Sequence, residues 1–208
     1  MIIIGLTGSI ASGKSTVASW IVERHIAVHD ADAVAHKLLN AKGKAVSEIV
    51  AKFGQFMQAK DGGIDRKKLG DHVFNHPHER KILESILHPK IKSHREQFLN
   101  AHRQGGSKLV VLDVPLLFET GGDVLCDFVV VVYAKEVTMR KRAFLRDGMT
   151  EEKFSGILET QIPAAQKCQH ADLILDTDLA PEITRQYLYD WLDNLMLTSE
   201  TYESDNNA

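Results

Sequence analysis

The stretch GLTGSIASGKST, residues 5–16, directly follows the apolar start MIII. Gly8, Gly13, Lys14 and Ser15 fit the pattern G-x-x-x-x-G-K-[ST]. This pattern binds phosphate when a buried strand precedes it and a helix follows it, because N–H groups at the start of a helix attract anions. The flanking residues indicate both elements. The stretch therefore predicts a nucleotide phosphate site.

The residues of this loop have distinct expected roles. Lys14 is expected to bridge the β and γ phosphates, and the Ser15 hydroxyl to ligate Mg²⁺. Ser9 and Ala11 stand where glycine would be the easy choice, which costs little if both have ordinary negative φ angles. The residues expected to bind the phosphates are Gly8, Ala11, Ser12, Gly13, Lys14, Ser15 and Thr16.

Composition sets bounds on the class of protein. The 208 residues are 44% hydrophobic and 25% charged, as in ordinary soluble chains. The net charge of -3 gives no general reason to expect nucleic acid. No apolar run approaches the roughly 18 residues that span a bilayer, and Cys126 and Cys168 predict neither a disulfide framework nor a zinc site. We expect a cytoplasmic protein that binds no membrane, no nucleic acid and no obligate protein partner.

Apolar runs and helix-like segments alternate along the chain. Continuous runs rich in Val, Ile and Leu are typical of parallel strands that are buried on both faces. After the first, such runs cover residues 26–30, 109–115, 128–134 and 171–177, and helix-like segments cover 14–24, 137–146, 151–161 and 181–197. The order predicts an α/β fold with a mainly parallel five-stranded sheet flanked by helices.

One connection is too long for a single crossover helix. No strong strand follows Asp30 until residue 109, and the intervening residues look helical, with a bend near Pro89. We predict a core of residues 1–31 and 108–208 and a helical insertion over 32–107. The insertion either holds a second substrate or is a decoration without function. The polar tail, residues 198–208, is predicted to be disordered.

Asp30 and Asp32, in the sequence DAD, have two interpretations between which spacing does not decide. An Asp before AVAHKLL is a good helix N-cap. Two carboxylates at the carboxyl end of a strand can instead orient an acceptor hydroxyl and take its proton. A GTPase is disfavoured, because the chain has no N-K-x-D sequence to read guanine and no D-x-x-G element after a strand.

Further motifs follow the phosphate loop in a fixed succession: HDADAVAHKL (29–38), ILHPKI (86–91), VLDVPLLFE (111–119), RAFLRDGM (142–149) and ILETQIP (157–163). This succession resembles the dephospho-CoA kinase family. The resemblance implies a P-loop kinase fold with a helical CoA-binding insertion and a small lid over residues 138–150. It also implies transfer of the γ-phosphoryl group of ATP to the ribose 3'-hydroxyl of dephospho-CoA, with Mg²⁺.

The resemblance also implies roles for single residues. Asp32 matches the catalytic aspartate of the family, which Asp30 supports, and Arg142 and Arg146 match the lid arginines; the alternative for the arginines is a solvated basic face. Gly156 stands where the family has an arginine, which removes one possible anion contact. The residues that match the acceptor site of the family are His88, Leu116, Phe118, Glu119 and Gln161. Without the resemblance, His88 would be interpreted as a surface histidine, and Leu116 and Phe118 as core residues.

Two other functions stay open at this point. A nucleoside or nucleoside-monophosphate kinase shares the phosphate loop and an inserted acceptor lobe. A non-catalytic ATP-dependent regulator shares the loop alone, but it needs no hydroxyl-orienting carboxylate such as Asp30 or Asp32.

Overall fold

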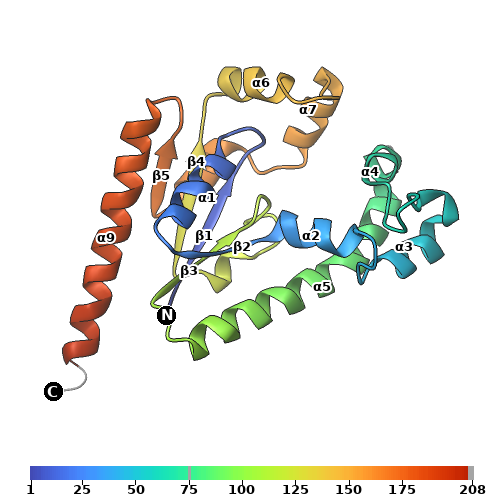
Figure 1. Cartoon of the computed structure of the whole chain (residues 1–208). Helices are drawn as coiled ribbons and strands as arrows, with labels where there is room; N and C mark the ends of the chain where they lie inside the picture. Colours follow the sequence, from blue (N-terminus) through green and yellow to red (C-terminus); the bar gives the residue numbers. More distant parts are fainter. Residues whose placement is uncertain (75, 206–208) are drawn as a thin grey trace. The chain divides into compact units, whose positions relative to one another are not determined.

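The computed structural model describes residues 1–74 and 76–205, with side chains up to residue 197. The chain divides into two compact units, Met1–His29 with Gly105–Ala208 and Asp30–Gln104 (Figure 1). Helix α9 (Pro181–Asp205) extends into the tail predicted to be disordered, residues 198–208, so residues 198–205 are helical, and the last three residues lie outside the described chain.

The first unit is built on a five-stranded parallel sheet in the order β2-β3-β1-β4-β5. All five predicted strands are present. In the register, Ile4 of the first strand lies between Val111 and Phe128 of its two neighbours. The strands are β1 (Ile2–Gly8), β2 (Ala27–Asp30), β3 (Leu109–Asp113), β4 (Phe128–Tyr133) and β5 (Leu173–Asp176).

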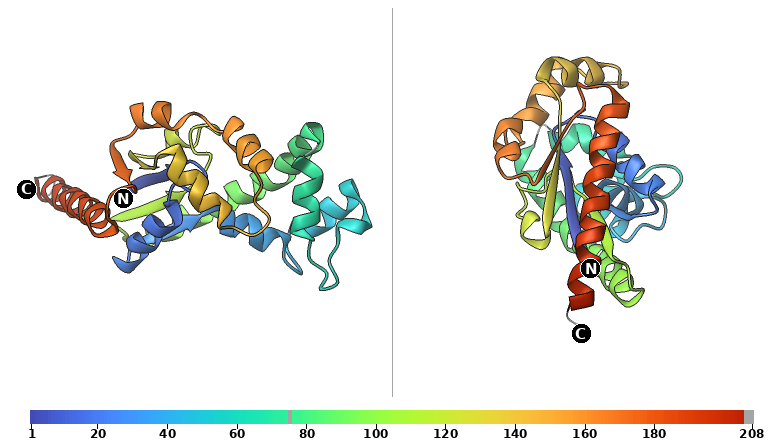
Figure 2. Two further views of the ribbon diagram at one scale, coloured as in Figure 1. Left: turned by 90° about the horizontal axis from the view of Figure 1, so that it is seen from above. Right: turned by 90° about the vertical axis from the view of Figure 1, so that its left-hand side faces the viewer.

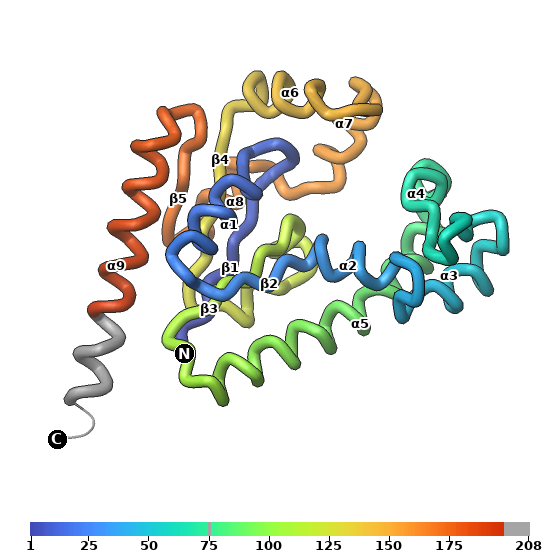
Figure 3. Tube along the Cα trace, viewed as in Figure 1, coloured from blue at the N-terminus to red at the C-terminus, as the bar shows by residue number. Residues whose placement is uncertain are grey.

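Helices cover both faces of this sheet. One apolar cluster joins α1 and α9 to one face through Val17, Leu188 and Val132. Because side chains alternate along a strand, Val131 lies on the other face, in a second cluster against which Cys168 of α8 packs. Figures 2 and 3 show α9 beside β5. Helix α8, labelled in Figure 3, contacts β4. The helices are α1 (Lys14–Glu23), α6 (Glu136–Phe144), α7 (Glu151–Glu159), α8 (Ala164–Gln169) and α9 (Pro181–Asp205), with a short 3-10 helix, η2 (Asp123–Leu125).

The second unit is helical and has an apolar core of its own. The first part of the predicted helical insertion, residues 32–53, contains two helices. The chain leaves the first helix at Asn40 and turns tightly at Gly43, where a Cβ would lie 2.2 Å from the carbonyl oxygen of Leu38. The last helix continues through Pro89. The elements are α2 (Ala31–Leu39), α3 (Val46–Phe53), η1 (Gln55–Met57), α4 (Arg66–Phe74) and α5 (Pro77–Gln104).

Each unit thus buries its own hydrophobic residues. In the second unit, Val34, Ile49 and Leu69 come from three helices and pack in one cluster with Ile86 of α5. Among the described helices, none has an apolar stretch long enough to cross a membrane.

Candidate active site

The turn between β1 and α1 presents unoccupied backbone donors. Gly13 caps α1 with a φ angle of 99°, and the first hydrogen bonds of the helix run from Thr16 and Val17 back to the Gly13 carbonyl. Within the described chain, the N–H groups of Ala11, Gly13, Lys14 and Ser15 have no hydrogen-bond acceptor. Such N–H groups at a helix start form an anion site, to which the helix dipole adds.

Ala11 does not have the negative φ angle at which an alanine in this loop would cost little. Its φ angle is 58°, in the left-handed region, so that condition fails for Ala11, whereas it holds for Ser9, whose φ angle is not positive. Alternation between right- and left-handed residues turns successive N–H groups toward one side, and this explains the unusual angle. The Ala11 methyl group is buried in a cluster with Met139 and Phe154, which compensates part of the backbone cost.

Lys14 is held by an acid that the sequence interpretation missed. Its Nζ lies 2.5 Å from Oδ1 of Asp113, and the two side chains are 15% and 4% exposed. Asp113 is the last residue of β3, and the parallel register places it beside Leu6 of β1, just before the loop. The signal was present, since LVVLD is an apolar run that ends in an acid.

The two predicted lid arginines have different surroundings. Arg142 donates to Thr177 Oγ1 at 2.8 Å and to the Thr177 carbonyl at 2.7 Å, and it lies 3.4 Å from the Ser12 carbonyl. Thr177 itself donates to the Ser12 carbonyl at 2.6 Å. Arg142 therefore connects α6, the phosphate loop and the end of β5. Arg146 is exposed, and its guanidinium forms no ion pair with a described residue.

Asp178, which interacts with the charge of Arg142, is held in its charged form. A hydrogen bond from the Thr138 side chain, together with the Lys135 backbone N–H at 2.9 Å, keeps the pKa of Asp178 below its ordinary value. The positive charges of Lys135 and Arg142 act in the same direction. The carboxyl ends of β4 and β5 are thus tied together next to the phosphate loop.

Glu119 and Gln161 are both engaged inside the first unit. Oε1 of Gln161 accepts the Ile10 N–H of the phosphate loop at 3.1 Å. Oε1 of Glu119 accepts the Ile162 N–H at 2.8 Å and forms an ion pair, also at 2.8 Å, with the fully buried Lys167. These bonds connect the segment after β3, the segment before α8 and the phosphate loop. The sequence interpretation missed Lys167, because nothing in the sequence of this short polar helix indicates that its lysine is buried.

Of the other residues of the predicted acceptor site, Leu116 and Phe118 belong to the first unit and His88 to the second. Leu116 and Phe118 are half-buried in the loop after β3, and the ring of Phe118 lies 6.0 Å from that of His170. His88 is exposed on α5, in the second unit. Their roles toward an acceptor stay predictions.

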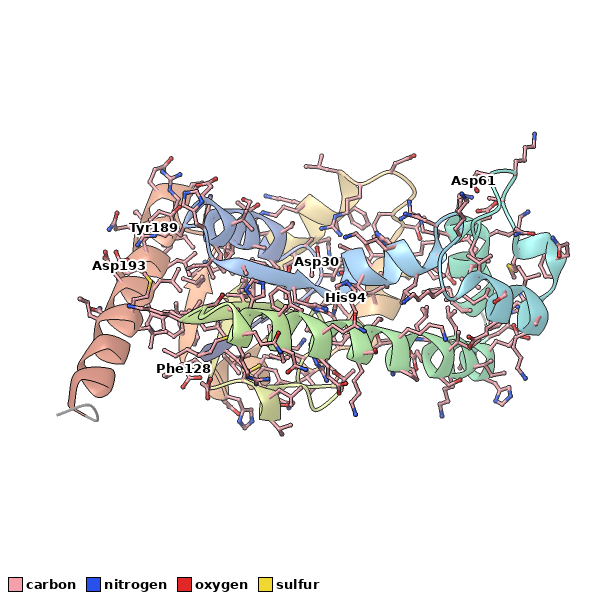
Figure 4. The ribbon with its side chains drawn as sticks, turned by 60° about the horizontal axis from the view of Figure 1, so that its bottom comes forward. Asp30, Asp61, His94, Phe128, Tyr189 and Asp193 are labelled. Atoms are coloured by element: carbon pink, nitrogen blue, oxygen red, sulfur yellow. The ribbon has the colours of Figure 1, made fainter. Side chains whose placement is uncertain are left out.

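Asp30 and Asp32 separate into two roles. Asp30 ends β2 and caps α2, because its Oδ1 accepts the Ala33 N–H at 2.8 Å (Figure 4). The N-cap interpretation is therefore correct for Asp30. Asp32 lies in the first turn of α2, where it is exposed and its carboxylate has no hydrogen bond with a described residue.

The parallel sheet, the phosphate loop after β1 and the lysine of that loop define a P-loop kinase. A family model described as Dephospho-CoA kinase matches residues 2–181. The chain belongs to the dephospho-CoA kinase family, and it is an ATP-dependent phosphotransferase.

Individual relatives support this membership. The "Dephospho-CoA kinase" of Mesorhizobium japonicum is 43% identical over 195 residues, 94% of this chain and 97% of the relative. A solved structure from Thermus thermophilus matches with a TM-score of 0.77 and 30% identity, over 93% of this chain and 97% of that one. The dephospho-CoA kinase from Campylobacter jejuni has a TM-score of 0.69 and 30% identity, over 93% and 96% of the two chains.

The cap of α2 leads to a test of stability. Asp30→Ala is expected to lower the free energy of unfolding by about 1 kcal/mol, because the Ala33 N–H loses its acceptor. Asp30→Asn should retain stability, since an amide oxygen caps equally well. Asp32→Ala should cost only about 0.3 kcal/mol through the helix dipole. Urea unfolding followed by circular dichroism measures all three; equal losses for Asp30→Ala and Asp32→Ala would contradict the assignment.

The buried ion pair leads to a second test. Lys167→Met leaves the Glu119 carboxylate, 13% exposed, without its cation, and should lower the free energy of unfolding by about 3–5 kcal/mol. Adding Glu119→Gln should recover part of the loss. The matched control is Arg185→Met, which breaks an exposed pair with Glu23 in the same unit and should cost less than about 1 kcal/mol. Similar unfolding curves for Lys167→Met and the control would disprove the importance of the buried pair.

Proposed function

We propose that this chain works in the cytoplasm and transfers the γ-phosphoryl group of ATP to the ribose 3'-hydroxyl of dephospho-CoA. The family implies both substrates. The observation that carries the residue-level proposal is the phosphate loop, in which four N–H groups have no acceptor among the described residues and Lys14 supplies a cation held by Asp113. These donors suit the β and γ phosphates of a nucleoside triphosphate.

The residues at the loop fit the Mg²⁺ that the family implies. Mg²⁺ prefers oxygen ligands, and the exposed Ser15 hydroxyl and the Asp113 carboxylate are oxygen donors on neighbouring elements. We propose that these two residues hold the ion, Asp113 directly or through water. When bound, Mg²⁺ neutralises charge on the transferring phosphates.

Lys14 changes partner when the nucleotide binds. Its ammonium group is attached to Asp113 in the structure, but a triphosphate carries more negative charge than one carboxylate and lies at the free N–H groups. Lys14 then bridges the β and γ phosphates, and Asp113 becomes available to the ion. The ion pair thus keeps the lysine in position before the substrate arrives.

Positioning and charge stabilisation supply most of the catalysis. Arg146 has no ion-pair partner among the described residues, and it contacts the transferring phosphoryl group. Arg142 is anchored to the loop and β5, and it fixes the lid at the nucleotide. Asp32 orients the acceptor hydroxyl and takes its proton, since its carboxylate has no hydrogen-bond partner in the described chain.

The acceptor site combines contact residues with positioning residues. His88, Leu116 and Phe118 are proposed to contact dephospho-CoA. Glu119 and Gln161 already have partners inside the first unit. We therefore propose that both keep the phosphate loop and the loop after β3 in register, and that they act on the acceptor through these loops.

The decisive assay is formation of coenzyme A from ATP, Mg²⁺ and dephospho-CoA by the purified chain. Lys14→Ala should lower the turnover by at least about 10²-fold, because a transition-state donor is lost. Lys67→Ala, which removes an exposed lysine of the second unit, is the control and should retain activity. Phosphorylation of a nucleoside or a nucleoside monophosphate in place of dephospho-CoA would overturn the proposed acceptor. Normal turnover of Lys14→Ala would show that the loop is only structural.

The role of Asp32 is tested separately. Asp32→Asn should lower kcat by at least about 10²-fold, as expected when a general base is removed, and should lower the free energy of unfolding by no more than about 0.3 kcal/mol, because the residue is exposed and only its interaction with the helix dipole is lost. Glu48→Gln, at another exposed acid of the second unit, is the control. Unchanged kcat for Asp32→Asn would remove Asp32 from the mechanism.

A further inference from the structure

A cluster of metal-ligating side chains lies within the second unit, where α4 ends and α5 begins. His72, His76 and Glu79 each offer one ligand atom, and these atoms all lie within 4.8 Å of one another. We propose that the three residues bind a divalent transition-metal ion of the zinc class. The proposal does not depend on the proposed catalytic residues, none of which belongs to the cluster.

His72 is held in place by its neighbours. The side chain is 28% exposed, and its ring meets Phe53 and Phe56 in edge-on contacts, with centroids 6.2 and 6.4 Å away. Packing on two sides restricts the ring orientation. A ligand that is already oriented loses less conformational entropy when it binds an ion.

His76 has one ring nitrogen in use. Its Nδ1 lies 2.7 Å from the His72 carbonyl oxygen. Because a carbonyl can only accept, Nδ1 carries the proton and Nε2 has a free lone pair in the neutral ring. Metal-binding histidines commonly donate their other N–H to a carbonyl in this way. The His76–His72 bond therefore prepares Nε2 as a ligand.

Glu79 supplies the oxygen of the cluster. Its Oε2 is in contact with Nε2 of His72. This oxygen is buried and accepts no hydrogen bond of normal geometry from a described residue. An ion pair with a protonated His72 would account for the contact with Glu79. The His76 ring lies beside this pair, with its centroid 4.8 Å from that of His72. One cation bound by the three residues would compensate the Glu79 charge and use the Nε2 lone pair of His76.

The donor set selects the class of ion. Two imidazole nitrogens and one carboxylate oxygen suit Zn²⁺, Ni²⁺ or Cu²⁺, whereas Mg²⁺ prefers oxygen ligands. The site is therefore chemically distinct from one for the Mg²⁺ that accompanies ATP. Because His72 belongs to α4 and Glu79 to α5, an ion bound here would link the two helices and stabilise the second unit.

The test uses the full chain after treatment with a chelator, without nucleotide. Zn²⁺ is titrated by calorimetry near neutral pH in the presence of excess Mg²⁺. Wild type should bind one Zn²⁺, and His76→Ala and Glu79→Gln should each lower the affinity by at least about 10-fold. His78→Ala is the matched control, because His78 is an exposed histidine of the same segment outside the cluster, and it should bind as wild type does.

Thermal unfolding gives a second measurement on the same proteins. Zn²⁺ should raise the melting temperature of wild type and His78→Ala, and should not raise that of His76→Ala. His76 is exposed, so its removal is not expected to prevent folding, and circular dichroism checks this. Absence of Zn²⁺ binding by wild type would overturn the proposal. Equal affinities of wild type and His76→Ala, or equal losses in His76→Ala and His78→Ala, would also overturn it.

Discussion

The ion pair between Lys14 and Asp113 depends on the pairing of β1 with β3. The proposed phosphate site depends in turn on that ion pair and on the strand pairing. The register places Asp113 beside Leu6, and the Val114 N–H continues the connection by donating to the Leu6 carbonyl at 3.0 Å. The Lys14 ammonium group is thus fixed beside the loop before any nucleotide is bound. An ion pair this well buried is costly to form unless both partners are well placed, and the central strands of a buried sheet provide that placement.

The loop itself is connected to the rest of the first unit from several directions. Gln161 binds the Ile10 N–H, Thr177 and Arg142 bind the Ser12 carbonyl, and the Ala11 methyl packs against residues of α6 and α7. These contacts hold a left-handed alanine that would otherwise favour another conformation. None of these contacts uses the N–H groups of Ala11, Gly13, Lys14 and Ser15, which have no acceptor among the described residues and are the proposed phosphate donors.

Much of the first unit could be predicted from the sequence, because strands buried on both faces are long apolar runs and the phosphate loop has a fixed spacing. What could not be predicted depends on contacts between distant residues or on backbone angles. Asp113 meets Lys14 across 99 positions, and Lys167 is identified only by its burial against Glu119. The φ angle of Ala11 follows from the turn and not from the residue type, and α8 is too short to show a helical period.

The hydrogen bonds within each unit also distinguish two groups among the predicted site residues: those that already have a partner and those that have none within the described chain. A polar group that already has a partner must lose it to contact a substrate, at a cost of about 1–3 kcal/mol if the partner is left buried. Asp30, Glu119 and Gln161 have such partners, which favours positioning roles. Asp32 and Arg146 have none among the described residues, which favours direct contact. In the proposed mechanism Lys14 is the exception, because a triphosphate would attract its charge more strongly than Asp113 does, and the lysine would change partner at little cost.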